Sequence, residues 1–195
     1  MRTLAALVAV LGLLVGCDDV PAPGRSDVDV DTAELRQIKD EARIEPCAEG
    51  PGGGELPDLT LPCLGGGPSV DLSTLRGPLV INTWASSCGP CVKEMPALQE
   101  FYKEYGDRVP VLGIDFLDTQ PGAALALAKE TGATYPSLAD PDGDLLEQKD
   151  LRLAAANPQF LLLNAQGALV HQQAGGLESV DEVVAMVNEH LGVEL

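Results

Sequence analysis

The chain has 195 residues, and 45% of them are hydrophobic, so it is long enough to bury the core of one domain. Its 30 acidic residues outnumber the 12 basic ones, which gives a formal net charge of -18 at pH 7. This charge argues against a nucleic-acid-binding protein, because phosphates would be repelled, and against docking on anionic lipid through a basic patch.

The first sixteen residues have the pattern of an export signal. Met1 and Arg2 form a short positive start, and an apolar run follows from residue 4 to residue 15. That run is too short to cross a bilayer comfortably, and it leads into Leu-Val-Gly-Cys, which resembles the bacterial lipobox. We therefore expect a signal peptide over 1–16 and a lipid on Cys17, which would anchor the protein to the cell membrane outside the cytoplasm. An ordinary secretory signal with a chance cysteine is the alternative.

Residues 17–55 are expected to connect this lipid to the domain. Asp, Pro and Gly are frequent over 18–31, a composition typical of a flexible acidic tether. A short amphipathic helix is expected over 32–43, because Asp31 and Glu34 have the spacing of a helix start.

The rest of the chain, 56–195, alternates strand and helix patterns. In chain order we expect a β-hairpin (59–61 and 70–72), a strand (79–83), a helix (90–105), a strand (109–116), a helix (121–131), a short strand (135–139), a turn and short helix (140–151), two hairpin strands (160–163 and 168–173) and a closing helix (179–191). This order predicts the α/β thioredoxin fold, a central mixed sheet flanked by helices, with an N-terminal β-hairpin extension.

Two cysteines stand where the first long strand meets a helix, in the sequence Trp-Ala-Ser-Ser-Cys-Gly-Pro-Cys over 84–91. A helix N-terminus stabilises a thiolate, which is the reactive form of cysteine. We expect Cys88 to be the nucleophile and Cys91, one turn on, to be the more buried resolving cysteine. Gly89 and Pro90 set the turn between them, and we expect both to belong to the substrate-binding surface.

Cys47 and Cys63 remain after Cys17 and the redox pair are assigned. In an exported protein an even remainder favours a structural disulfide, which would stabilise the fold by ~3 kcal/mol. Two free buried thiols, or a second redox pair that exchanges with the first, are the alternatives.

Three separated segments, 71–77, 80–96 and 157–161, resemble the thioredoxin-like TlpA/ResA family of membrane-tethered bacterial thiol–disulfide oxidoreductases. The resemblance implies that Glu94 assists proton transfer near the cysteines. It also implies that Pro158 is a cis-proline beside them, with Asn157 offering backbone groups to an extended substrate. Trp84 matches the family's strand-end aromatic, which packs near the cysteines, and it is expected to be one of the substrate-binding residues.

Two residues depart from ordinary thioredoxins. Asn82 is neutral where thioredoxins carry a buried aspartate, which strengthens the case that Glu94 supplies the acid. Ser87 replaces the tryptophan that usually precedes the first cysteine. His171 and His190 are interpreted as structural or solvated.

The resemblance implies a tethered enzyme that reduces specific protein disulfides, in a role like cytochrome c maturation, with electrons from a membrane-embedded donor. No cofactor is expected, because the glycines over 65–67 lack the context of a dinucleotide fingerprint. No metal is expected, because the chain has no second Cys-x-x-Cys to complete a zinc site and its two histidines are unpaired in sequence. Two alternatives to this reductase remain. The protein could be a dithiol oxidase for exported proteins, or a non-enzymatic tethered module that binds Cu(I) as a metallochaperone. A thiol peroxidase is disfavoured, since Cys88 does not lie in a Thr-x-x-Cys setting.

Overall fold

The computed structural model describes residues 25–195. The predicted signal peptide over 1–16 and the lipidation site Cys17 lie outside these residues and stay predictions. Among the helices of the described part, none is both long and apolar enough to cross a membrane.

A five-stranded mixed sheet forms the centre of the molecule, in the order β5-β4-β3-β6-β7. The elements in chain order are α1 (Ala33–Ala42), β1 (Thr60–Leu61), β2 (Val70–Asp71), η1 (Leu72–Thr74), β3 (Leu79–Trp84), α2 (Gly89–Tyr105), β4 (Val111–Phe116), α3 (Pro121–Thr131), β5 (Ser137–Asp140), η2 (Asp144–Glu147), β6 (Gln159–Leu163), β7 (Leu169–Ala174) and α4 (Val180–Leu191). Strands β3, β4 and β5 are parallel, whereas β6 pairs antiparallel with β3, and β7 with β6. The predicted thioredoxin order and the predicted hairpin, β1–β2, are confirmed.

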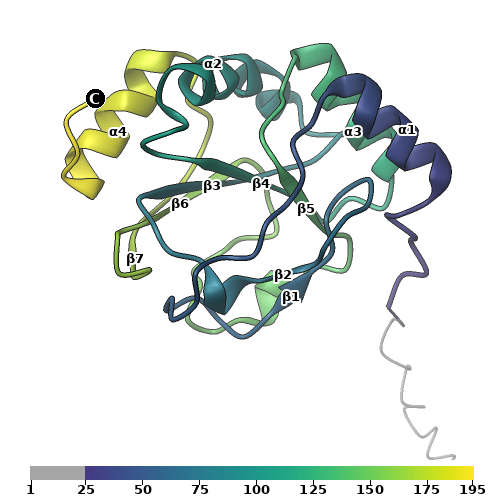
Figure 1. Ribbon diagram of the computed structural model, residues 1–195, viewed down its shortest axis with the longest axis horizontal. Helices are drawn as coiled ribbons and strands as arrows, with labels where there is room; N and C mark the ends of the chain where they lie inside the picture. The colour runs from purple at the N-terminus through teal and green to yellow at the C-terminus, as the bar shows by residue number, and fades with distance from the viewer. Residues whose placement is uncertain (1–24) are drawn as a thin grey trace, which may run out of the picture.

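The two faces of the sheet are covered differently (Figure 1). The helices α1 to α4 gather over one face, where Val80 and Trp84 of β3 belong to a core shared with all four. The β1–β2 hairpin and the two 3-10 helices cover the other face, above Leu79 and Ile81. Because successive side chains of a strand point to opposite faces, β3 buries all six of its residues between the two cores.

Local capping sets the helix ends. The first helix begins with Thr32 as its N-cap, whose hydroxyl accepts the Leu35 N–H at 3.2 Å. The sequence pattern, with Glu34 three residues after Asp31, predicts Asp31 as the N-cap, and this prediction is wrong. The Asp31 carboxylate instead accepts a hydrogen bond from the Arg36 side chain at 2.6 Å. Ser179 caps α4 as expected.

The segment that precedes the sheet contributes to the helix-side core. Val30 and Leu35 are buried in it, and α1 packs against α3. Arg25 pairs with Asp144 at 2.8 Å. Residues 25–31, the described part of the predicted tether, therefore lie against the domain.

Cys47 and Cys63 form a disulfide, with Cα atoms 5.9 Å apart. Cys63 makes an isolated antiparallel bridge with Leu138 of β5. The bond thus ties the irregular segment after α1 to the β5 edge of the sheet.

Candidate active site

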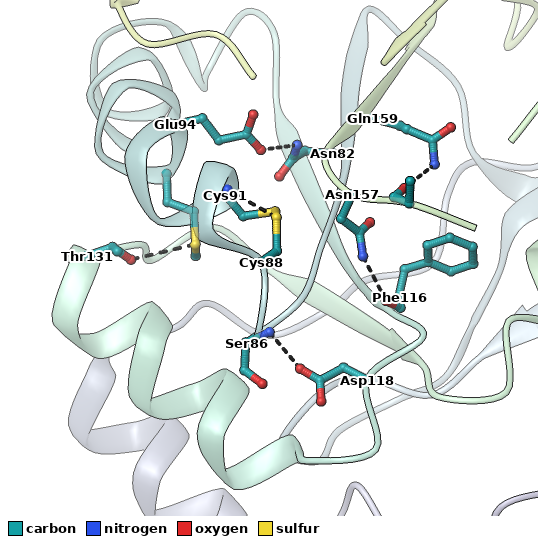
Figure 2. Close-up of a disulfide and its surroundings, with 12 residues drawn as sticks. Asn82, Ser86, Cys88, Cys91, Glu94, Phe116, Asp118, Thr131, Asn157 and Gln159 are labelled. Atoms are coloured by element: carbon teal, nitrogen blue, oxygen red, sulfur yellow. Dashed lines mark hydrogen bonds between the residues drawn. A yellow bond between two sulfur atoms is a disulfide. The ribbon is translucent and has the colours of Figure 1, made fainter. Parts of the chain in front are cut away.

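The predicted redox pair lies where β3 leads into α2 (Figure 2). Cys88 is the N-cap residue of α2, and its Sγ accepts a hydrogen bond from the Cys91 N–H at 3.1 Å. The two cysteines form a disulfide, with Cα atoms 5.3 Å apart. Cys88 is half-buried and Cys91 is fully buried. Cys88 is therefore the sulfur that a partner protein can reach.

The surface next to Cys88 is open. Ser87, Gly89 and Pro90 are all exposed, and a side chain added at Gly89 would meet nothing within 4 Å. Pro90 lies in the first turn of α2, where its missing N–H leaves no helical hydrogen bond unmade. Gly89 and Pro90, which are expected to contact the substrate, thus lie at the surface beside the reachable sulfur.

Glu94 lies one turn after Cys91 and is fully buried. Its Oε1 accepts a hydrogen bond from the Asn82 side chain at 2.8 Å, across from β3 (Figure 2). Burial raises the pKa of Glu94 to about 8, and the hydrogen bond from Asn82 offsets only part of this effect. Its pKa therefore approaches that of a free thiol, as proton exchange with a cysteine requires.

The predicted cis peptide bond between Asn157 and Pro158 is confirmed. The Asn157 side chain donates to the Phe116 carbonyl at 2.9 Å, which fixes this loop to the end of β4 (Figure 2). A Cβ at Gly176 would lie 3.2 Å from Glu94 Oε2 and 3.8 Å from Pro158 Cγ. Gly176 therefore lies close to both the Glu94 carboxyl group and the Pro158 ring, and its lack of a side chain leaves room for both.

Trp84 lies beneath the site. Its side chain is fully buried, and a Cβ at Gly113 would come within 2.8 Å of the indole nitrogen. The indole therefore covers the glycine of β4. Trp84 supports the strand end from inside and does not itself offer a surface to a substrate.

Two aspartates also belong to the site, although the sequence did not indicate them: Asp115 near the end of β4 and Asp118 just after it. Asp118 accepts the Ser86 N–H at 2.6 Å (Figure 2). It also accepts the Gln120 N–H at 2.8 Å. Burial, together with the neighbouring Asp118 carboxylate, raises the pKa of Asp115 well above its ordinary value. Asp118 therefore holds the loop that leads to Cys88, next to the Asp115 carboxyl group, whose pKa burial raises.

Comparisons with known proteins agree with this geometry. A family model described as the AhpC/TSA family matches residues 53–172. A protein named as a homolog of the thiol:disulfide interchange protein DsbE, from Paracoccus denitrificans, is 34% identical over 132 residues, which cover 66% of this chain and 69% of the relative. The thiol-disulfide oxidoreductase ResA of Halalkalibacterium halodurans is 25% identical over 125 residues, which cover 62% of this chain and 69% of the relative.

A solved structure shows the same fold. The exposed lipoprotein thioredoxin of Streptococcus pneumoniae matches with a TM-score of 0.55 at 26% identity, over 68% of this chain and 99% of that one. The disulfide at the start of α2, the cis-proline loop and the family match over more than half of the chain lead to one conclusion. This chain belongs to the AhpC/TSA family and is a thioredoxin-like thiol–disulfide oxidoreductase of the kind named DsbE and ResA.

Proposed function

We propose that this protein is a membrane-anchored, extracytoplasmic enzyme that reduces disulfides in particular exported proteins. The arrangement of the two sulfurs carries the proposal: Cys88 is reachable at the N-terminus of α2, and Cys91 is buried beneath it. The relatives named DsbE and ResA support the same chemistry.

In the reduced protein, Cys88 begins the reaction as a thiolate. The Cys91 N–H, 3.1 Å from Cys88 Sγ, and the N-terminus of α2 stabilise its negative charge. The thiolate attacks one sulfur of the partner disulfide, so that a Cys88–sulfur bond forms and the partner's S–S bond breaks. The electron pair leaves on the second partner sulfur, which takes up a proton.

Cys91 completes the reaction. Its thiolate attacks Cys88 Sγ, closes the enzyme disulfide and releases the first partner sulfur with its electron pair. Cys91 must first lose its proton, and the carboxylate form of Glu94, one turn away, accepts it. A pKa of about 8 suits this exchange, whereas the Asn82 amide cannot carry the proton.

The segment before β6 is the proposed substrate-binding edge. The Pro158 carbonyl already accepts the Gly175 N–H at 3.0 Å. The backbone of Asn157 therefore offers the next groups for strand-like pairing with an extended partner segment. Such pairing would hold the partner's disulfide beside Cys88 and explain selection among exported proteins.

The proposed location depends on Cys17. A lipid there would hold the domain at the outer side of the cell membrane, where a membrane-embedded dithiol donor can reduce the Cys88–Cys91 bond again. The lipoprotein relative from Streptococcus pneumoniae supports this location. Cells fed with labelled fatty acid should label this protein, and Cys17→Ser should abolish the label; a labelled serine variant would refute the anchor.

Trapping tests the reaction directly. In Cys91→Ser the mixed disulfide on Cys88 cannot be resolved, so partner proteins should accumulate as adducts that dithiothreitol releases. Adding Cys88→Ser should remove every adduct. Adducts that survive this second substitution would show that Cys88 is not the nucleophile.

The reduction potential of the Cys88–Cys91 couple separates the reductant from the dithiol oxidase. A value well below about -200 mV is expected for the reductant, whereas a value near -120 mV would assign the oxidase. Stoichiometric Cu(I) in the purified protein without disulfide reductase activity would assign the metallochaperone. Rapid peroxide turnover would assign a thiol peroxidase.

A further inference from the structure

A lysine lies buried against the second disulfide. Lys39 of α1 is 6% exposed, and its Nζ lies 3.0 Å from Cys63 Sγ and 2.7 Å from the Gly66 carbonyl oxygen. Within residues 25–195 no carboxylate forms an ion pair with it; Asp31 and Asp40 act on it only from a distance. Burial lowers the pKa of Lys39 accordingly. A negative charge on Cys63 would supply the missing counter-charge.

The following turn is folded around this lysine. Gly65, Gly66 and Gly67 all have positive φ angles, of 72°, 91° and 121°. A Cβ at Gly65 would lie 3.0 Å from Lys39 Cβ, and one at Gly67 would lie 3.7 Å from Cys63 Sγ. The positive φ angles favour glycine at all three positions, and at Gly65 a side chain would also crowd Lys39. The glycine run, which fits no dinucleotide site, therefore has a use: it encloses the lysine against the sulfur.

The surroundings of the two sulfurs also suit the reduced pair. Cys47 Sγ lies 3.3 Å from the Ser137 carbonyl oxygen. A disulfide sulfur has no proton to donate there, but a neutral Cys47 thiol does. After reduction, Cys47 as a thiol and Cys63 as a thiolate would each have a partner of the right kind already in place.

The two sulfurs differ in their access from solvent. Both cysteine side chains are buried, but Cys47 is flanked by exposed residues on both sides, from Glu45 to Glu49. Cys63 is followed by a buried residue, Leu64, and lies under the glycine turn. A small local opening of the segment after α1 would expose Cys47 first.

We propose that Cys47–Cys63 is a second redox-active disulfide, which a dithiol reduces by attack on Cys47 while Lys39 stabilises the departing Cys63 thiolate. The attacking thiolate forms a bond to Cys47 Sγ, the Cys47–Cys63 bond breaks, and its electron pair stays on Cys63. The second thiol of the reductant then loses its proton and attacks the mixed disulfide. Cys47 leaves and takes up a proton, and the reductant departs oxidised. The proposal goes beyond the Cys88–Cys91 reaction and does not depend on it.

The first test uses the full chain with Cys17→Ser, Cys88→Ser and Cys91→Ser, so that Cys47 and Cys63 are its only cysteines. Brief exposure of the folded protein to reduced glutathione, followed by acid quenching and peptide mass mapping, should place glutathione on Cys47. An adduct on Cys63, or reduction that occurs only after urea unfolds the chain, would overturn the proposal.

The second test measures the equilibrium constant for reduction of the same chain in a dithiothreitol redox buffer. Lys39→Met should lower this constant by at least tenfold, which corresponds to about 30 mV. A merely structural lysine predicts the opposite sign, because a loosened loop makes the bond easier to reduce. Lys129→Met, which removes an exposed lysine of α3 that pairs with Glu41, should leave the constant unchanged. An unchanged or larger constant in Lys39→Met overturns the proposal.

A third measurement needs no lysine variant. In the reduced three-serine chain, thiolate absorbance should show one cysteine that ionises well below the value of about 8.5 for a free thiol. Two thiols that both titrate at or above that value would overturn the proposal, even if Lys39→Met failed to fold.

Discussion

The buried pair of Asn82 and Glu94 places a proton carrier on the active-site helix and a neutral amide on the strand. The Asn82 side chain donates to Glu94 Oε1, so the amide favours the charged form of the acid, while burial opposes it more strongly. The balance leaves Glu94 able to gain or lose a proton near neutral pH. Two neighbouring acids would instead share one proton, and neither would titrate alone.

This balance predicts a stability that depends on pH. The folded protein keeps the Glu94 proton up to about pH 8, whereas the unfolded chain releases it near the ordinary value of 4.5. Between these values the folded state binds the extra proton, so the free energy of unfolding should fall as the pH rises. The stability that the protonated Glu94 contributes to the fold is fully present below pH 4.5 and is lost as the pH rises through about 8.

Glu94→Gln should remove this dependence, because glutamine keeps the shape without the proton. Between pH 5 and pH 8 the free energy of unfolding of the parent should fall, relative to that of Glu94→Gln, by on the order of 3 kcal/mol. Urea unfolding across that range measures it. Glu100→Gln, on the exposed side of the same helix, is the control and should show a flat difference. If the stability difference for Glu94→Gln were equally independent of pH, the raised pKa of Glu94 in the folded protein would be contradicted.

At the scale of elements, two segments far apart in the sequence hold the approach to Cys88. The loop from β3 to α2 is held by Asp118, which follows β4, and Asn157 ties the proline loop to the carbonyl of Phe116 at the same strand end. The end of β4 thus positions both sides of the active site. The part-buried Ser86 N–H donates its hydrogen bond to the Asp118 carboxylate, so loss of that carboxylate would leave the N–H without this acceptor.

Asp118→Ala should therefore loosen the loop. The loss of acceptors for the Ser86 and Gln120 N–H groups should cost about 1–3 kcal/mol of stability and slow the reaction of Cys88 with a small disulfide. Urea unfolding and stopped-flow thiol exchange measure the two effects. Asp107→Ala, at an exposed position after α2, should change neither. If Cys88 reacts at the parental rate in Asp118→Ala, the loop is held by other contacts.

The sequence predicted the parts of this site that are local. Cys88 and Cys91 are recognisable from their spacing and from the strand and helix patterns around them. Pro158 and Glu94 followed from the resemblance. Asp118 could not be found this way, because its role depends on the pairing of β3 with β4, which places residue 118 beside residue 86.

Across the whole molecule, the order of elements was predictable and the position of the N-terminal segment was not. Alternating strand and helix patterns predicted the mixed sheet, since parallel βαβ units have few alternative arrangements. The packing of α1 on α3 depends on contacts between distant residues, such as Glu41 with Lys129 at 2.9 Å. His171 of β7 and His190 of α4 also meet only in space, with ring centroids 3.6 Å apart.

The Cys47–Cys63 bond holds this N-terminal segment to the sheet, so it should contribute to the stability of the whole domain. Its cysteines lie 16 positions apart in the sequence, and closing a loop of that length restricts the unfolded chain. Cys47→Ser with Cys63→Ser should lower the free energy of unfolding by about 3 kcal/mol under oxidising conditions. Cys88→Ser with Cys91→Ser, which opens a ring with a separation of only 3, should cost less.

The active site should survive the loss of Cys47–Cys63. The sheet between the two cores keeps its own strand pairing, and Cys91 belongs to the helix-side core, whereas Cys47 and Cys63 belong to the other. The Cys47→Ser/Cys63→Ser chain should therefore reduce a model disulfide at close to the parental rate at a temperature where it stays folded. Insulin reduction, measured beside urea unfolding, separates the two effects. A folded double variant without activity would mean that the second disulfide also shapes the first.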